Sequence, residues 1–263
     1  MSCGEGVTEV MDAFTPLIWT LAMTVALTGG MVKGAVGFAL PLVMISGLST
    51  IMDPRLALAG LILPVVATNA VQVFRTGLAP AGQAVRLHWR YVVTVMVAIF
   101  VAAQFVTSIP RQAFLLVLGV PVVILSAIQL IGWRPTVPPR RRNAAEWGLG
   151  TLAGALGGLA GTWGPPTVLY LLAIGTPKDR QMVVQGVIYG LGSIPLVLGH
   201  LRSGILNAET ALFSASMLPA SLVGLLIGLA LRDRLDADRV RRITLIVLVV
   251  AGLNLIRRGL LSG

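Results

Sequence analysis

Charged residues are scarce in this sequence, and cysteine is nearly absent. Only 11% of its 263 residues are charged, whereas a soluble domain carries about 25%. The single cysteine, Cys3, excludes a disulfide scaffold and a cysteine-ligated metal site. Hydrophobic residues make up 56% of the chain, and its mean hydropathy is +0.89. The composition therefore predicts an integral membrane protein.

Carboxylates are missing from the apolar runs. Asp53, Asp179 and Glu209 all lie at the ends of such runs. The sequence has no Gly-x-Ser-x-Gly motif, and neither histidine belongs to an HExxH motif or pairs with a cysteine. These absences argue against an intramembrane enzyme. We expect no cofactor and no metal ion.

The positive charge is concentrated in short loops between the apolar runs. A net charge of +10 on a soluble protein would suggest nucleic acid, but basic loops in a membrane protein set its orientation, so no nucleic-acid partner is expected. No Lys or Arg precedes Lys33, so the first apolar run lacks the basic start of a signal peptide and is expected to be retained. With the acidic N-terminus outside, the loops predicted inside hold Arg75, Arg86, Arg90, Arg134, Arg140, Arg141, Arg142, Lys178, Arg180, Arg232, Arg234, Arg239, Arg241 and Arg242. This bias predicts that both termini are periplasmic.

The apolar runs have the length of helices and exceed the roughly ten residues of a barrel strand. The fold class is therefore an all-α membrane protein, a polytopic helical bundle. Because Pro165–Gly175 is too short to span, we expect about eight spans, with short pieces that enter and leave on one side. The predicted helical segments are 13–32, 34–48, 56–74, 89–108, 113–132, 147–161, 165–175, 181–200, 208–231 and 240–256.

The two halves of the chain resemble each other. A basic, proline-rich linker over 133–146 separates a first repeat, 1–132, from a second, 147–263. The spacing of Gly30, Gly34 and Gly37 recurs in Gly157, Gly161 and Gly164. A repeat with an odd number of segments inserts upside down relative to its twin. Inverted repeats, each with a Gly/Pro-broken helix pair that is possibly re-entrant, are typical of secondary transporters.

The stretch 28–41 is the first predicted break, and it contains a lone cation. Its glycines and proline interrupt a helix, and Lys33 is costly at membrane depth unless it faces protein, water or an anion. Free N–H groups at helix N-termini add to an anion site. Alternatively, Lys33 reaches the inner membrane surface, and the glycines serve close helix packing.

Polar residues on two further segments are candidates for the same site. Thr68, Asn69 and Gln72 share one side of their segment and are predicted to donate hydrogen bonds to the anion. Interhelical hydrogen bonding is the alternative. Trp163 in the second break is expected to close the site or stack on an organic substituent. The full set of predicted substrate-binding residues is Lys33, Gly34, Gly37, Phe38, Thr68, Asn69, Gln72, Thr162, Trp163, Gly164, Gln185 and Tyr189.

Three motifs make the chain resemble the TauE/SafE sulfite exporter family, also called the toluene sulfonate uptake permease family. They are Gly30-x3-Gly34-x2-Gly37-x3-Pro41, the second-half Gly-Gly-x-x-Gly-x-x-Gly-Pro-Pro ending at Pro166, and Pro64-x4-Asn69. The first break departs from many members, since Phe38-Ala39-Leu40 stands where they carry a Gly-Gly-Gly run. The resemblance implies transport of sulfur-containing anions, usually export, across a bacterial inner membrane.

The sequence thus predicts a secondary transporter, an exporter of a small anion such as sulfite, a sulfonate or sulfoacetate, that works by alternating access. A passive anion channel and an importer of the same anions are the alternatives. The expected partners are the anion and membrane lipids, and the protein is a monomer or a homodimer.

Overall fold

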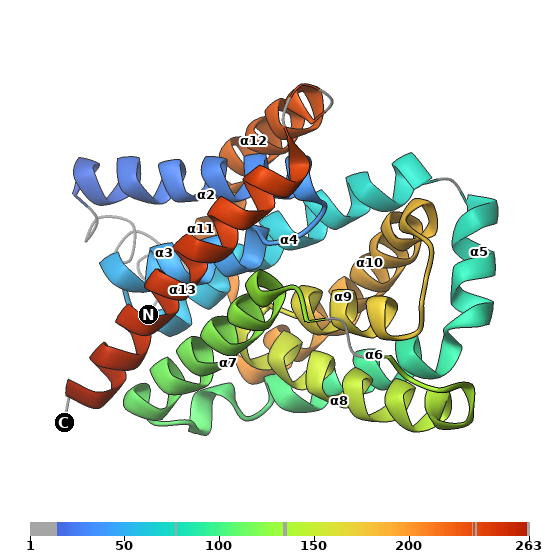
Figure 1. Ribbon diagram of the computed structural model, residues 1–263. Coiled ribbons are helices and arrows are strands. Elements are labelled where there is room, and N and C mark those ends of the chain that lie inside the picture. Colours follow the sequence, from blue (N-terminus) through green and yellow to red (C-terminus); the bar gives the residue numbers. More distant parts are fainter. Residues whose placement is uncertain (1–14, 77, 134–135, 233, 235, 262–263) are drawn as a thin grey trace.

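The computed structural model describes residues 15–76, 78–133, 136–232, 234 and 236–261. Every regular element in these residues is a helix, which confirms the predicted all-helical fold. Cys3, the acidic N-terminal residues and Arg134 lie outside the described residues. The elements (Figure 1) are α2 (Pro16–Val36), α3 (Leu40–Ile51), α4 (Pro54–Thr76), α5 (Leu78–Leu87), α6 (Trp89–Ala103), η1 (Val106–Ser108), α7 (Arg111–Ile131), η2 (Pro139–Arg141), α8 (Arg142–Ala160), α9 (Gly164–Ala173), α10 (Lys178–Ser203), α11 (Ala208–Ser216), α12 (Leu218–Leu231) and α13 (Ala237–Leu261).

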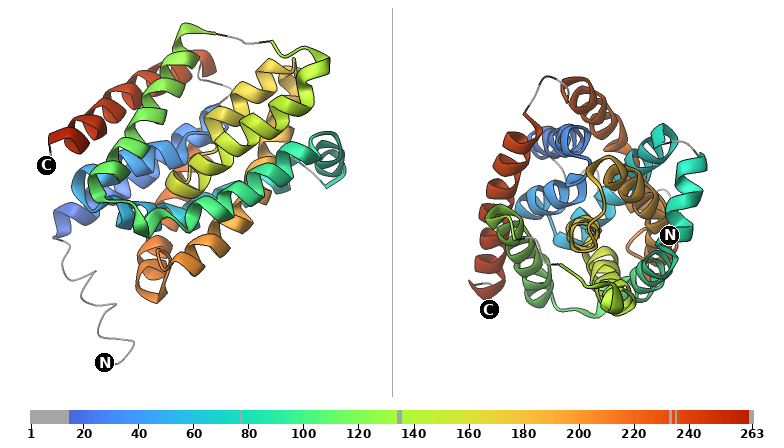
Figure 2. Two further views of the ribbon diagram at one scale, coloured as in Figure 1. Left: turned by 90° about the horizontal axis from the view of Figure 1, so that it is seen from below. Right: turned by 45° about the vertical axis from the view of Figure 1, so that its right-hand side comes forward.

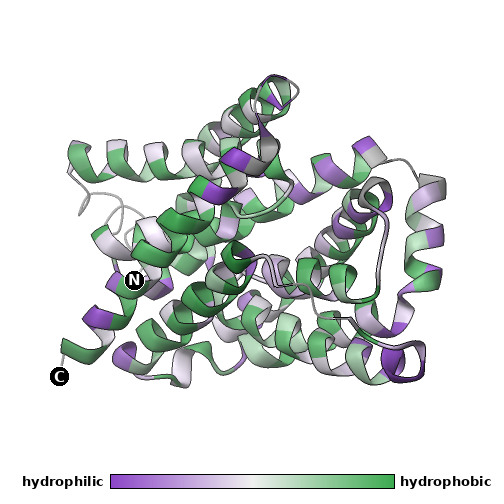
Figure 3. Cartoon of the chain, viewed as in Figure 1, coloured by the Kyte–Doolittle hydropathy of each residue, from purple (hydrophilic) through white to green (hydrophobic). Residues whose placement is uncertain are grey.

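Seven helical stretches in the described part of the chain are long and apolar enough to cross a membrane. The 23 residues of α4 extend about 34 Å at 1.5 Å per residue, which matches a hydrocarbon core of about 30 Å. Hydrophilic residues gather mainly near helix ends, and apolar residues dominate the helix surfaces (Figure 3). The protein is therefore a multi-pass membrane protein. The seven stretches are Pro16–Val36, Pro54–Arg75, Trp89–Ser108, Arg111–Ile131, Arg180–Ser203, Ala208–Leu231 and Arg242–Leu261.

Two helical elements differ from the prediction, one for a backbone reason and one because of its composition. The single segment predicted over 208–231 is interrupted at Met217 between α11 and α12. Pro219 lies in the first turn of α12, where its missing N–H costs nothing. The short helix α5 was not predicted, because its ten residues mix Gln83 and Arg86 with apolar side chains.

The first break lies later in the chain than predicted. Helix α2 continues through Lys33 to Val36, and α3 begins at Leu40. The earlier glycines lie within α2, and two of them allow α2 to approach α12 closely. A β-carbon on Gly30 would collide with the carbonyl of Ser221, and one on Gly34 would collide with that of Leu225. Close packing is thus the role of these two glycines, and Gly37 begins the break.

The second half contains the same kind of glycine contact. Gly154 and Gly158 of α8 lie against the backbone of α6, where added β-carbons would meet Val95 and Ile99. Helix α2 packs mainly on α12, α8 on α6, and α7 on α13, while α4 and α10 also contact each other. Figure 2 shows the resulting bundle from two further sides. The inverted repeat and the division at 133–146 remain predictions, and the end of that linker is helical because α8 begins at Arg142.

The two ends of the bundle carry different polar contacts. Arg75 and Arg232 line one cleft, and Arg90 and Arg142 both pair with Glu146. We call the end that carries these four arginines the basic end. At the opposite end, Arg55 donates hydrogen bonds to carbonyl oxygens between α6 and α7, those of Thr107 at 3.0 Å and Ile109 at 2.7 Å.

Candidate anion-binding site

Both helix breaks depend on left-handed backbone conformations. Gly37 ends α2 with φ 86°, and Gly161 ends α8 with φ 68°. Between α2 and α3, Ala39 also has a positive φ of 82°, and no other non-glycine residue in the described ranges does. A β-carbon makes this conformation unfavourable by about 1–2 kcal/mol. The first break is therefore strained and is held by its surroundings.

Residues of the two breaks come together. Gly164 lies so close to Phe38 that a β-carbon on Gly164 would be 3.7 Å from the Phe38 β-carbon. The hydroxyl of Tyr189 on α10 donates to the Gly164 carbonyl at 3.2 Å. A cavity of about 20 Å³, enough for a single water molecule, is lined by Lys33, Phe38, Ala39, Pro41, Val65, Asn69, Gly161, Trp163, Gly164 and Tyr189. This geometry agrees with the prediction that Trp163, in the second break, lies at the same site as Lys33.

Lys33 is buried beside α4. Only 3% of its surface is exposed. Its ammonium donates to the hydroxyl oxygen of Thr68 at 2.9 Å and to the side-chain oxygen of Asn69. No carboxylate among the described residues forms an ion pair with it. A buried ammonium has three donors, and a full positive charge without a counter-ion is unfavourable at membrane depth. The site is thus complementary to an anion.

Thr68 and Asn69 hold Lys33 with acceptor oxygens, because their own donors are already used. The Thr68 hydroxyl donates to the Pro64 carbonyl at 2.6 Å. The Asn69 amide donates to the Tyr189 carbonyl at 3.1 Å and to the Ser193 hydroxyl at 2.9 Å. In this conformation the two residues therefore position the ammonium. They do not donate to an anion, which differs from the prediction made from the sequence.

Pro64 shapes α4 at this depth without leaving a polar group unsatisfied. A proline inside a helix cannot donate to the carbonyl four residues earlier, here that of Gly60. The hydroxyl of Ser214 on α11 donates to this carbonyl at 3.1 Å and accepts from the Leu63 N–H at 3.0 Å. Helix α11 thereby supports the turn of α4 that precedes Thr68.

A cleft leads from Lys33 to the basic end. It has a volume of about 290 Å³, which is large enough for a small organic anion, unlike the cavity between the breaks. We call it the Lys33 cleft. Gln72 on its wall donates weakly, at 3.4 Å, to the Gly37 carbonyl. The residues lining it are Lys33, Gly34, Gly37, Thr68, Val71, Gln72, Arg75, Met182, Val183, Leu225, Leu229 and Arg232.

Gln185 lies in a neighbouring cleft. This second cleft has a volume of about 620 Å³ and is lined by Phe38, Gln129, Trp133, Gln181, Met182, Gln185 and Arg232, among others. The Gln185 side chain is only 6% exposed. An added β-carbon on Gly37 would lie 3.8 Å from its amide oxygen. Gln185 therefore lies close to Gly37 in the first break.

Trp163 and Thr162 complete the predicted set. The rings of Trp163 and Tyr189 meet edge to face, with centroids 6.3 Å apart. The indole N–H of Trp163 is buried without a hydrogen-bond partner. Thr162 is 4% exposed, and its backbone N–H donates to the Leu156 carbonyl at 3.3 Å. Thr162 lines neither cleft nor the cavity between the breaks, so its placement offers no contact to an anion in those spaces.

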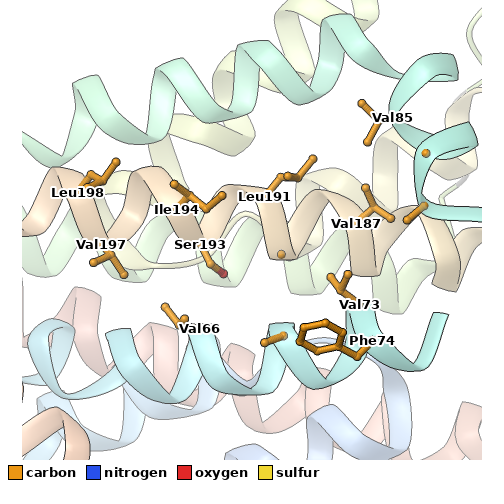
Figure 4. A pocket seen from close by; sticks show the side chains of 14 residues that line it. Val66, Val73, Phe74, Val85, Val187, Leu191, Ser193, Ile194, Val197 and Leu198 are labelled. Carbon is orange, nitrogen blue, oxygen red and sulfur yellow. The ribbon is translucent and has the colours of Figure 1, made fainter. Parts of the chain in front are cut away.

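An apolar cavity of about 550 Å³ lies between α4, α5 and α10. Its walls are aliphatic and aromatic side chains such as Val66, Phe74 and Leu191, with Ser193 as a polar exception (Figure 4). A pocket of this character offers an anion no charge and almost no donors. The Lys33 cleft, which is lined by three cations, is therefore the candidate anion site.

Sequence reasoning missed two sets of polar residues. Ser193 continues the four-residue spacing of Gln185 and Tyr189, so the signal for it was present. Glu146 was placed in the interior linker, yet it lies in α8 and is only 2% exposed. Its carboxylate accepts from Arg142 at 3.0 Å and from the Tyr170 hydroxyl at 3.2 Å. The local sequence, rich in arginine and proline, gave no indication of this burial.

The Glu146 contacts join α8 and α9 to the start of α6. His88 Nδ1 lies 2.8 Å from the Tyr170 hydroxyl, and the rings of Tyr91 and Tyr170 stack with centroids 4.1 Å apart. Burial and the nearby charge of Arg142 lower the pKa of His88 to about 4, against an opposing effect of Glu146. His88 is therefore neutral at pH 7, and its contact with Tyr170 helps to fix α9 at the basic end of the bundle.

Most of the bundle, including both breaks, matches one family model. The model, described as "Sulfite exporter TauE/SafE", covers residues 22–255. The chain belongs to the TauE/SafE sulfite exporter family. The matched range contains every predicted substrate-binding residue of this TauE/SafE protein, and the family resemblance seen in the sequence is confirmed. Searches among curated proteins and among solved structures found no match.

Proposed function

We propose that this TauE/SafE protein is a secondary transporter that exports a small sulfur-containing anion, such as sulfite or a sulfonate, by alternating access. The observation that carries the proposal is Lys33. Its ammonium is buried at the junction of the two helix breaks, lacks a carboxylate partner among the described residues, and lines a cleft from the basic end. An anion in the cleft would supply the missing negative charge.

The packing of the helices supports an inverted repeat. If α2, α3, α4, α6 and α7 correspond to α8, α9, α10, α12 and α13, a two-fold axis exchanges the α2–α12 contact with the α8–α6 contact. The same axis maps the α7–α13 and α4–α10 contacts onto themselves. All four contacts are present. Rocking of one repeat against the other would open the Lys33 cleft alternately to the two sides.

Orientation follows the distribution of arginine. We propose that the basic end faces the cytoplasm of a bacterial cell, that the membrane is the inner membrane, and that both termini are periplasmic. In this orientation the Lys33 cleft opens inward. An exporter that loads its substrate from the cytoplasm requires such a state.

Flux measurements in proteoliposomes test the proposal. Vesicles loaded with labelled sulfite or isethionate should release it at a rate that saturates with concentration, and unlabelled substrate outside should accelerate the release. Release that rises linearly and ignores outside substrate would instead identify a channel. Lys33→Met should abolish release. The absence of any flux in the wild type would refute the transport proposal.

A further inference from the structure

Two arginines on the Lys33 cleft have no acidic partner among the residues that the structure describes. Arg75 on α4 forms no ion pair with a described residue, and Arg232 at the end of α12 has one described partner, the Met182 sulfur, at 2.6 Å. A thioether sulfur is a weak acceptor, whereas a guanidinium offers five donors in a fork that matches an oxyanion. With respect to the described residues, most of the binding capacity of Arg232 is therefore unused.

The three cations of the cleft lie at different depths. Lys33 is buried, Arg232 is partly buried and Arg75 is exposed. None of the described residues that line the cleft carries a negative charge. The positive charge therefore extends from the basic end to the buried ammonium. An anion entering from that end meets the arginines first.

We propose that Arg75 and Arg232 form a second anion-binding position in the Lys33 cleft, which a sulfonate or sulfite occupies before it reaches Lys33. This inference rests on the transport function proposed above and adds a second binding position, nearer to the basic end, to the same transport path. The incoming oxyanion replaces the Met182 sulfur as the acceptor of Arg232. Fixed cations at a cleft mouth also raise the rate of association, and salt weakens this effect.

Titration calorimetry of the purified full chain with isethionate, in a neutral detergent at low salt, tests the second position. Arg232→Gln should weaken binding about tenfold, the loss expected for one charge-assisted contact. Arg234→Gln is the matched control, since Arg234 is an exposed arginine at the same end and lines no described part of the cleft. The control should bind as the wild type does. Lys33→Met should leave weak, salt-sensitive binding that the double variant Lys33→Met/Arg232→Gln loses.

The outcomes separate the two proposals. If the wild type binds neither isethionate nor sulfite, the transport function itself fails. If the wild type binds but Arg232→Gln and Arg234→Gln have equal affinities, only the second position is refuted. If added phosphatidylglycerol blocks isethionate binding in the wild type but not in Arg232→Gln, the arginine holds a lipid phosphate and the assignment to the substrate is overturned. Arg75→Gln repeats the test from the other wall should Arg232→Gln fail to fold.

Discussion

The ammonium of Lys33 donates to the hydroxyl oxygen of Thr68 at 2.9 Å, which joins the end of α2 to the middle of α4. The Thr68 hydroxyl in turn donates to the Pro64 carbonyl. The only buried lysine in the described residues is thus fixed by oxygen acceptors on a proline-modified turn. This arrangement leaves the charge itself available to an anion.

Replacing Lys33 separates function from stability. Lys33→Met removes a buried charge without a counter-ion, so the protein should be as stable as the wild type or more stable by about 1–4 kcal/mol. Binding of isethionate at the position beside Lys33 should be lost. Thermal unfolding in detergent, with and without 10-fold excess ligand over the wild-type dissociation constant, measures both effects. A large fall in the unfolding temperature would show that the ammonium is structural.

Replacing Asn69 should have the opposite effect on stability. Asn69→Leu removes the acceptor of Lys33 and the donor to Tyr189 and Ser193, and it leaves a buried cation with Thr68 alone. The expected loss is about 1–3 kcal/mol. The double variant Lys33→Met/Asn69→Leu should recover part of it, because no buried charge then lacks a partner. Strictly additive effects of the two substitutions on the free energy of unfolding would contradict the assigned role of Asn69.

The charge of the cleft predicts discrimination between two sulfonates of similar size. Isethionate carries a hydroxyl where taurine carries an ammonium, and the described residues of the Lys33 cleft include three cations and no carboxylate. Taurine should therefore bind at least about tenfold more weakly. Calorimetry with both compounds checks this, and equal affinities would place the substrate elsewhere.

The protein should become less stable in acid because His88 is buried at the basic end. Its pKa is about 4 in the folded protein and about 6.5 when unfolded. Between these values the unfolded chain binds the additional proton, so stability falls as pH drops from about 6.5 to 4. The variant His88→Gln keeps a polar side chain beside Tyr170 and has no imidazole to protonate. Its unfolding temperature should therefore fall less over this pH range than that of the wild type. Parallel pH profiles for the two proteins would rule out His88 as the cause.

The strained first break makes a prediction about Ala39. Ala39→Gly relieves about 1–2 kcal/mol of backbone strain but adds about 0.5–1 kcal/mol of unfolded-chain entropy, so the protein should be as stable as the wild type or more stable by up to about 1.5 kcal/mol. Ala39→Val places a β-branched side chain at φ 82° in a buried position and should cost about 2 kcal/mol or more. Thermal unfolding of the pair checks the conformation, and equal stability of both variants would exclude it.

Much of this architecture could be read from the residues alone. Apolar length defined the spans, and glycine and proline marked two breaks, the first within 28–41 and the second near Gly161. Local signals could not say which glycines bend the chain and which allow close packing, because that depends on the partner helix. Gly30 and Gly34 lie within α2, and their role in close packing is seen only once α12 is placed against them.

The site shows the same division. The polar residues Lys33, Thr68 and Asn69 stood out because such groups are rare in apolar helices. Their roles depended on hydrogen bonds between distant helices, which no local spacing encodes. Ser193, Arg232 and Glu146 gained their significance in the same way, through contacts made across the bundle.

The sequence by itself determined that the chain is an all-helical membrane protein of the TauE/SafE type, because hydrophobic length and glycine spacing are properties of contiguous residues. Tertiary structure alone decided that the two breaks adjoin one buried ammonium, and that its cleft opens at the basic end. The physical reason is that burial and charge pairing depend on which surfaces meet, and those surfaces come from helices far apart in the chain.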